Sequence, residues 1–143
     1  NDLWLADMDG DGFLDVVGAA LTPTTIIWYK NPCTTSPCSV STIATAWAAN
    51  TIDAAAACVR NLALADLDLD GDIDVVANTS SASAGVAWYE NPTWTKRTLT
   101  TTAAATGVVA ANLNSNGDRA LEIIAASTSG ARSSVMPPMA TTG

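Results

Sequence analysis

LWLADMDGDGFLDVV (residues 3–17) aligns without gaps with LALADLDLDGDIDVV (residues 62–76), and this repetition decides how the chain is organised. A second motif follows each copy, IWYKNP at residues 27–32 and AWYENP at residues 87–92. The acidic stretches begin 59 residues apart (at 7 and 66), and the Trp-Tyr pairs lie 60 residues apart (at 28 and 88). Two motifs that share one period indicate an internal repeat.

A third and weaker copy, VVAANLNSNGD, occupies residues 108–118. It follows the second copy after fewer residues than separate the first two, so the connecting segments shorten. We predict three units, at residues 1–57, 58–105 and 106–143, the last of them degenerate and continuing into a C-terminal tail. Because the chain begins without Met and directly inside a predicted strand, we expect a processed chain or a piece of a longer one.

Each of the first two units is predicted to contain four strands separated by turn residues. The two strands around each acidic loop are apolar on both faces, which is typical of a sheet covered on both sides, as in blades stacked around an axis. We therefore predict an all-β fold of four-stranded antiparallel β-propeller blades, about two and a half to three in number. So few blades cannot close a ring, and we expect the rest in a longer chain, in other chains or in an open array. The predicted strands are 3–6, 15–19, 25–29 and 49–52, then 62–65, 74–77, 86–89 and 95–100.

The aspartates of the two acidic stretches recur at alternate positions, which directs their carboxylates to one side of a tight loop. Glycine at position 6, Gly12 or Gly71, permits the backbone angles of such a turn. Carboxylates at positions 1, 3, 5 and 9, with a backbone carbonyl at position 7, form an oxygen cage of the kind that calcium prefers. The predicted ligands are Asp7, Asp9, Asp11, Phe13 and Asp15 in the first loop and Asp66, Asp68, Asp70, Asp72 and Asp74 in the second, with Phe13 and Asp72 contributing backbone carbonyls.

Other metal sites fit these loops less well. An EF-hand needs a glutamate at position 12 and a helix on each side of the loop. Here position 12 is Gly18 or Ala77, and each loop is flanked by predicted strands, the second of which contains a Val-Val pair. Magnesium keeps more of its water, and zinc prefers histidine or cysteine ligands, but the chain has no histidine.

The third loop offers mostly neutral oxygens, so we predict a weak or empty third site there. In strict register its position 9 is Ala120, and Glu122 fits only after a shift of two residues. The candidate ligands of this third site are Asn112, Asn114, Asn116 and Asp118.

Composition argues against a nucleic-acid partner and against a membrane-spanning segment. The net charge is −8, and no basic patch is visible, which argues against a nucleic-acid-binding surface. No stretch is long and apolar enough to span a membrane. Because 48% of the residues are hydrophobic and only 14% are charged, we expect neighbouring blades or copies of the same protein to cover part of the surface.

Three cysteines and one sequon bear on the cellular compartment, and the alternative to a disulfide is three buried thiols in a cytosolic protein. We predict a disulfide between Cys33 and Cys38, which lie in a polar loop, and we expect Cys58 to face the core. Asn78 opens an Asn-Thr-Ser sequon on a predicted loop and is a candidate N-glycosylation site, although such a sequon also arises by chance.

The repeated Ala-Asp-x-Asp-x-Asp-Gly-x-x-Asp-Val-Val motif followed by Trp-Tyr-x-Asn-Pro resembles the FG-GAP/VCBS repeat family, which includes the integrin alpha-chain β-propellers. The resemblance covers about the first 125 residues, strongly in two units and weakly in the third. It implies four-stranded antiparallel blades, calcium in the loop between the first two strands of each blade, and usually seven blades. The calcium ligands that it implies coincide with the aspartates named above.

These observations favour an extracellular or cell-surface calcium-binding module with a structural or adhesive role, such as a subunit of a coat or filament. The alternative is a glycan-binding propeller lectin, in which Trp47 and Trp94 would serve as sugar platforms while Trp28 and Trp88 pack between blades. We expect no catalysis, because the chain lacks histidine and a nucleophile motif and its clustered carboxylates are assigned to metal. A third hypothesis is that the chain is the non-catalytic propeller part of a polysaccharide-active enzyme.

Overall fold

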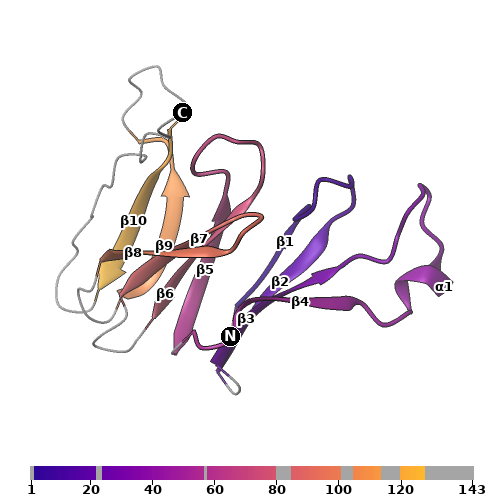
Figure 1. Ribbon diagram of the computed structural model, residues 1–143, viewed down its shortest axis with the longest axis horizontal. Helices are drawn as coiled ribbons and strands as arrows, with labels where there is room; N and C mark the ends of the chain where they lie inside the picture. Colours follow the sequence, from indigo (N-terminus) through magenta and orange to yellow (C-terminus); the bar gives the residue numbers. More distant parts are fainter. Residues whose placement is uncertain are drawn as a thin grey trace.

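The computed structural model describes residues 2–21, 24–56, 58–79, 85–100, 105–113 and 120–127, which form three antiparallel sheets (Figure 1). Blade 1 consists of β1 (Asp2–Ala6), β2 (Asp15–Leu21), β3 (Thr24–Lys30) and β4 (Ala48–Asp53), in that order. Blade 2 repeats this arrangement with β5 (Val59–Ala65), β6 (Asp74–Thr79), β7 (Val86–Glu90) and β8 (Thr95–Thr100). The third sheet pairs β9 (Ala105–Ala111) with β10 (Glu122–Ser127), and the short helix α1 (Val40–Ile43) lies between β3 and β4.

The predicted all-β fold of four-stranded antiparallel blades is confirmed. Every predicted strand of the first two units lies inside an observed strand, because the hydrophobic runs and the turn residues that bound them are local features of the sequence. Helix α1 was not predicted; it is a single turn in which the Ser39 side chain accepts a hydrogen bond from the Thr42 N–H. Strand β9 begins at Ala105, the last residue that we assigned to the second unit.

Blade 2 is covered on both faces. The side chains of one face pack against blade 1, and those of the other face pack against the third sheet, so that every residue of β6 is buried. This arrangement explains why its strands lack the alternation of polar and apolar residues. The face toward blade 1 includes Leu62, Val75, Ala77, Ala87 and Tyr89, and the face toward the third sheet includes Ala63, Val76, Val86 and Trp88.

Blade 1 has a face equivalent to the blade 2 face that packs against blade 1; we call it the outer face, and no sheet of the described residues covers it. Strand pairing places Leu3, Leu5, Val16, Ile27 and Tyr29 on this face. Leu3 is 72% exposed whereas its counterpart Leu62 is 1% exposed, and Tyr29 is 37% exposed whereas Tyr89 is 1% exposed. The same set of side chains is therefore buried by a neighbouring blade in one repeat and left uncovered in the other.

Hydrogen bonds join the two blades at several points. The Leu62 N–H donates to Asp2 Oδ2 at 2.8 Å, near the contact between β1 and β5. The Tyr89 hydroxyl donates to Asp53 Oδ2 at 2.7 Å. Apolar packing together with these directional bonds fixes how one blade sits on the next.

The predicted location of Asn78 on a loop is wrong. Asn78 is fully buried in β6, where its Oδ1 accepts a hydrogen bond from the Asn61 N–H at 2.7 Å and its Nδ2 donates to the Ala105 carbonyl at 3.0 Å. Strand β6 extends beyond the predicted strand and is covered by both neighbours, so this amide has no room for a glycan in the folded chain.

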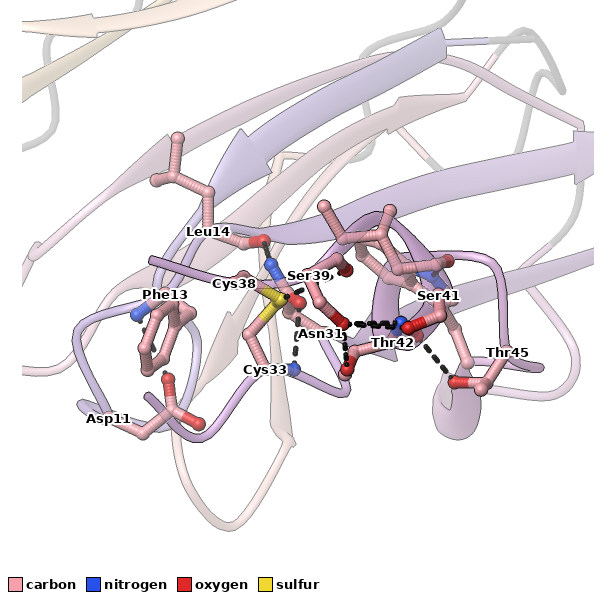
Figure 2. Close-up of a disulfide and its surroundings, with 12 residues drawn as sticks. Asp11, Phe13, Leu14, Asn31, Cys33, Cys38, Ser39, Ser41, Thr42 and Thr45 are labelled. Atoms are coloured by element: carbon pink, nitrogen blue, oxygen red, sulfur yellow. Dashed lines mark hydrogen bonds between the residues drawn. A yellow bond between two sulfur atoms is a disulfide. The ribbon is translucent and has the colours of Figure 1, made fainter. Parts of the chain in front are cut away.

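The cysteines are placed as follows. Cys33 and Cys38 form a disulfide with a Cα–Cα distance of 5.7 Å, and Figure 2 shows it between the first acidic loop and the segment that carries Ser39 and Thr42. The prediction that Cys58 faces the core is wrong, because Cys58 is exposed. It has a φ of 54° just before β5, and the next residue, Val59, takes the core position.

No helix in the described ranges is long and apolar enough to cross a membrane.

Candidate metal centre

The two acidic loops occupy the same place in the two blades, between β1 and β2 and between β5 and β6, and they share two internal hydrogen bonds. In each loop the position 1 carboxylate accepts from the N–H of the position 6 glycine, and the position 5 carboxylate accepts from the N–H at position 7. The pairs are Asp7–Gly12 and Asp66–Gly71, at 2.8 and 3.1 Å, and Asp11–Phe13 and Asp70–Asp72, at 3.0 and 2.9 Å.

Positive backbone φ angles allow this turn. Gly12 and Gly71 have φ values of 89° and 103°, which glycine adopts without steric cost. Position 4 also has a positive φ, 72° at Gly10 and 65° at Leu69. Leucine is disfavoured in this conformation, so the backbone requirement of the loop overrides local preference at Leu69.

Carboxylate oxygens converge in both loops. One oxygen each from Asp7, Asp9 and Asp15 lie within 4.8 Å of one another, and the same holds for Asp66, Asp68 and Asp70. In the second loop, Asp66 Oδ1 and Asp68 Oδ1 are buried and have no hydrogen-bond partner. Because a buried carboxylate oxygen without a partner is costly, this donor set fits a hard cation such as calcium.

The pKa values agree with this interpretation. Burial, followed by the charge of Asp70, raises the pKa of Asp68. Burial also raises the pKa of Asp74 to about 6, although hydrogen bonds from Asn91 and Leu67 act in the opposite direction. Both carboxylates therefore lie where a positive ion would stabilise their charged form.

The position 9 aspartates have a structural role that the sequence did not reveal. Asp15 and Asp74 are fully buried, and each accepts two backbone hydrogen bonds, one from position 2 of its own loop and one from the asparagine that follows the Trp-Tyr strand. Their N–H donors are Met8 and Asn31 for Asp15, at 2.9 and 2.7 Å, and Leu67 and Asn91 for Asp74, at 3.0 and 2.9 Å. These carboxylates therefore join the loop to the Asn-Pro turn.

The predicted ligands differ in how closely they converge. Asp15 belongs to the converging set of the first loop, whereas Asp74 lies outside the set formed by Asp66, Asp68 and Asp70. The N–H groups of Phe13 and Asp72 donate within their loops, and the Asp72 side chain is exposed.

The third loop is closed by Glu122. The Leu113 N–H donates to Glu122 Oε2 at 2.7 Å, as the position 2 N–H groups donate to Asp15 and Asp74 in the other loops. Glu122 also pairs with Ala111 across the strands in the way that Asp15 pairs with Ala6. The shift of two residues is therefore real, and Ala120 does not close the loop. Of the candidate ligands Asn112 is exposed, while Asn114, Asn116 and Asp118 lie outside the described residues.

A family model described as an FG-GAP-like repeat matches the chain twice, at residues 7–77 and 66–125. The chain belongs to the FG-GAP-like repeat family. Repeats of this family are β-propeller units and are typical of extracellular proteins, and both matches include an acidic loop of the geometry described above. No curated protein and no solved structure matches the chain.

The asparagine after the Trp-Tyr strand connects one FG-GAP-like blade to the preceding one, a role that sequence reasoning missed. Asn91 Nδ2 donates to the Ile73 carbonyl at 3.0 Å within its own blade and to the Met8 carbonyl of blade 1 at 2.9 Å. Asn31 Nδ2 donates to the Leu14 carbonyl, the equivalent bond within blade 1 (Figure 2). The repetition of Asn-Pro in both units was the available signal.

The tryptophans of the two FG-GAP-like blades fall into two groups. Trp28 and Trp88 are buried between sheets, as predicted. Trp47 and Trp94, the predicted sugar platforms, are half-buried: Trp47 Nε1 donates to the Ile43 carbonyl at 3.1 Å, and Trp94 packs against the core between the blades. Trp4 on β1 is the more exposed aromatic side chain.

Proposed function

We propose that this FG-GAP-like chain is a calcium-binding structural module. The observation that carries the proposal is the pair of buried, unpartnered oxygens of Asp66 and Asp68 beside a third carboxylate, that of Asp70. Calcium takes six to eight oxygen ligands and tolerates irregular geometry, so it suits a loop of carboxylates and backbone carbonyls better than magnesium does.

In the second loop Asp66, Asp68 and Asp70 would hold the ion, and in the first loop Asp7, Asp9 and Asp15 would do so. When bound, calcium supplies positive charge that neutralises the repulsion among these carboxylates. The turn itself is held by the hydrogen bonds of Asp11 and Asp70 to their own loops. The ion would therefore stabilise a loop whose backbone bonds are already formed.

Calcium titration of chelator-treated protein by isothermal calorimetry tests this proposal. We expect saturable binding, and we expect the double substitution Asp66→Ala and Asp70→Ala to remove the contribution of the second loop. Asp72→Ala is the matched control, since it removes an exposed carboxylate of the same loop and keeps the backbone carbonyl. Failure to detect binding at millimolar calcium, by calorimetry and by equilibrium dialysis, would contradict the proposal.

We also propose that another blade of the same family, from a longer chain or a second copy, covers the outer face of blade 1. Support comes from Leu3 and Tyr29, whose counterparts Leu62 and Tyr89 are buried by blade 1 itself. Burial of such side chains contributes about 1.5–3 kcal/mol each. This packing would suit a coat, a filament or a ring.

Duplicating residues 2–60 directly before Asp2 tests the docking of another blade, because the native β4–β5 connection is then reproduced. In the extended chain we expect slower amide hydrogen exchange in β1 of the second copy, which the added blade would cover. We also expect a higher melting temperature than that of the original chain. The same extended chain with Leu3→Lys and Tyr29→Lys in its second copy is the matched control and should lose both effects. Unchanged exchange in β1 of the extended chain would argue against this interface.

An extracellular or cell-surface location and an adhesive, non-catalytic role complete the proposal. Family membership supports the location, and the Cys33–Cys38 disulfide agrees with an oxidising compartment. The engagement of the clustered carboxylates in the two loops supports a binding role. Glycan binding has less support, since Trp47 and Trp94 are both half-buried and already engaged.

A further inference from the structure

The residue before the asparagine of the Trp-Tyr-x-Asn-Pro motif differs between the two blades. It is Lys30 in blade 1 and Glu90 in blade 2, in each case the last residue of the third strand. The following asparagine is held in the same way in both blades, by its N–H donating to Asp15 or to Asp74. The side chains at 30 and 90 therefore start from equivalent backbone positions beside equivalent loops.

Lys30 places its ammonium among the carboxylates of the first loop. Its Nζ forms ion pairs with Asp9 Oδ2 and with Asp11 Oδ2, the latter at 2.6 Å. A tethered cation thus already pairs with Asp9, one of the carboxylates that we assign to calcium, and with the neighbouring Asp11.

Glu90, at the equivalent position of blade 2, supplies no positive charge to the second loop. Its carboxylate pairs with Arg97, whose Nε donates to Glu90 Oε2 at 2.9 Å and whose guanidinium lies over the Trp88 ring. The oxygens Asp66 Oδ1 and Asp68 Oδ1 stay buried without a partner. Among the described residues, the loop carboxylate oxygens that are buried without a hydrogen-bond partner thus belong to blade 2, which has Glu90 in place of Lys30.

We propose that Lys30 is an intramolecular competitor of calcium, so that the first loop binds the ion more weakly than the second and releases Lys30 when it does. This inference rests on the proposed calcium binding and adds that the two sites are unequal. A unit charge about 5 Å from a divalent ion in a water-like dielectric changes its affinity on the order of tenfold. The ion pairs of Lys30 are partly exposed, so they can be displaced at modest cost.

The test compares calcium affinities in chains that retain only the first site. In the background of Asp66→Ala and Asp70→Ala, we expect Lys30→Met to strengthen calcium binding about tenfold by calorimetry. Lys30→Gln, a second variant with a polar side chain, should have the same effect if both fold, as judged by circular dichroism. Lys96→Met removes the same charge from a lysine that pairs with Asp53 and should change the affinity less than about twofold.

The reciprocal exchange tests the second loop. In the otherwise unaltered chain, Glu90→Lys should weaken the stronger calcium site about tenfold or more and bring the two sites closer in affinity. Two equal sites that neither Lys30→Met nor Glu90→Lys changes would overturn the inference and leave the proposed calcium binding intact. Absence of calcium binding in every variant would overturn the proposed function and this inference together.

Discussion

Calcium is expected to raise the melting temperature of the chelator-treated protein by about 10 °C when the ion is present at about 100 times its dissociation constant. A ligand that binds only the folded state at this concentration stabilises it by about 2.7 kcal/mol. For a domain of roughly this size, each kcal/mol corresponds to about 4 °C. The unpartnered oxygens of Asp66 and Asp68 are the reason to expect native-state binding. Differential scanning calorimetry in excess chelator and in excess calcium measures the shift.

Two controls isolate the contribution of the loops to this shift. The double substitution Asp66→Ala and Asp70→Ala should remove most of the calcium-dependent increment, whereas Asp72→Ala should retain it. Magnesium at the same concentration should raise the melting temperature less, because it gives up its water less readily. Identical melting curves with and without chelator would refute a stabilising role for calcium.

Asp74→Ala is expected to destabilise the protein by about 2–4 kcal/mol even in the presence of chelator. The substitution leaves the buried N–H groups of Leu67 and Asn91 without acceptors, at a cost of about 1–3 kcal/mol each. Part of this loss is offset, since burial raises the pKa of Asp74 to about 6 and the ionised carboxylate is itself costly to bury at neutral pH. Urea denaturation in chelator measures the change in the free energy of unfolding.

Asp74→Asn separates the hydrogen bonds of Asp74 from its charge. Its amide oxygen can still accept one of the two N–H groups, so we expect a loss about half as large as for alanine. Asp72→Ala again serves as the matched control and should change stability by less than about 0.5 kcal/mol, because its side chain is exposed. A loss for Asp74→Ala that appears only in the presence of calcium would mean that Asp74 acts through the metal rather than through these bonds.

The converging carboxylates of the candidate site could be predicted from the sequence, whereas the hydrogen bonds of Asp74 could not. The alternating carboxylates and the position 6 glycine could be identified because a loop of nine residues determines its own turn geometry. The converging oxygens of Asp66, Asp68 and Asp70 agree with that expectation. The two amide hydrogen bonds of Asp74 could not be predicted, because Asn91 reaches this carboxylate only when β6 and β7 pair.

Sequence by itself determined the repeat, the strands and the position of both loops. Hydrophobic runs bounded by Asp, Gly and Asn-Pro are local signals, and their recurrence from residues 3–17 to residues 62–76 placed equivalent strands in two blades. The loops needed no knowledge of distant residues, since alternation along a short turn directs the carboxylates to one side.

Only the tertiary structure decided which residues those local elements meet. Asn78 is buried because β6 has a sheet on each side, and Glu122 closes the third loop because strand pairing sets it opposite Ala111. Lys30 reaches the first loop through the pairing of β2 and β3, whereas the equivalent Glu90 of blade 2 pairs with Arg97. The charges that distinguish the two loops therefore come from residues outside the acidic motif, and the fold brings them there.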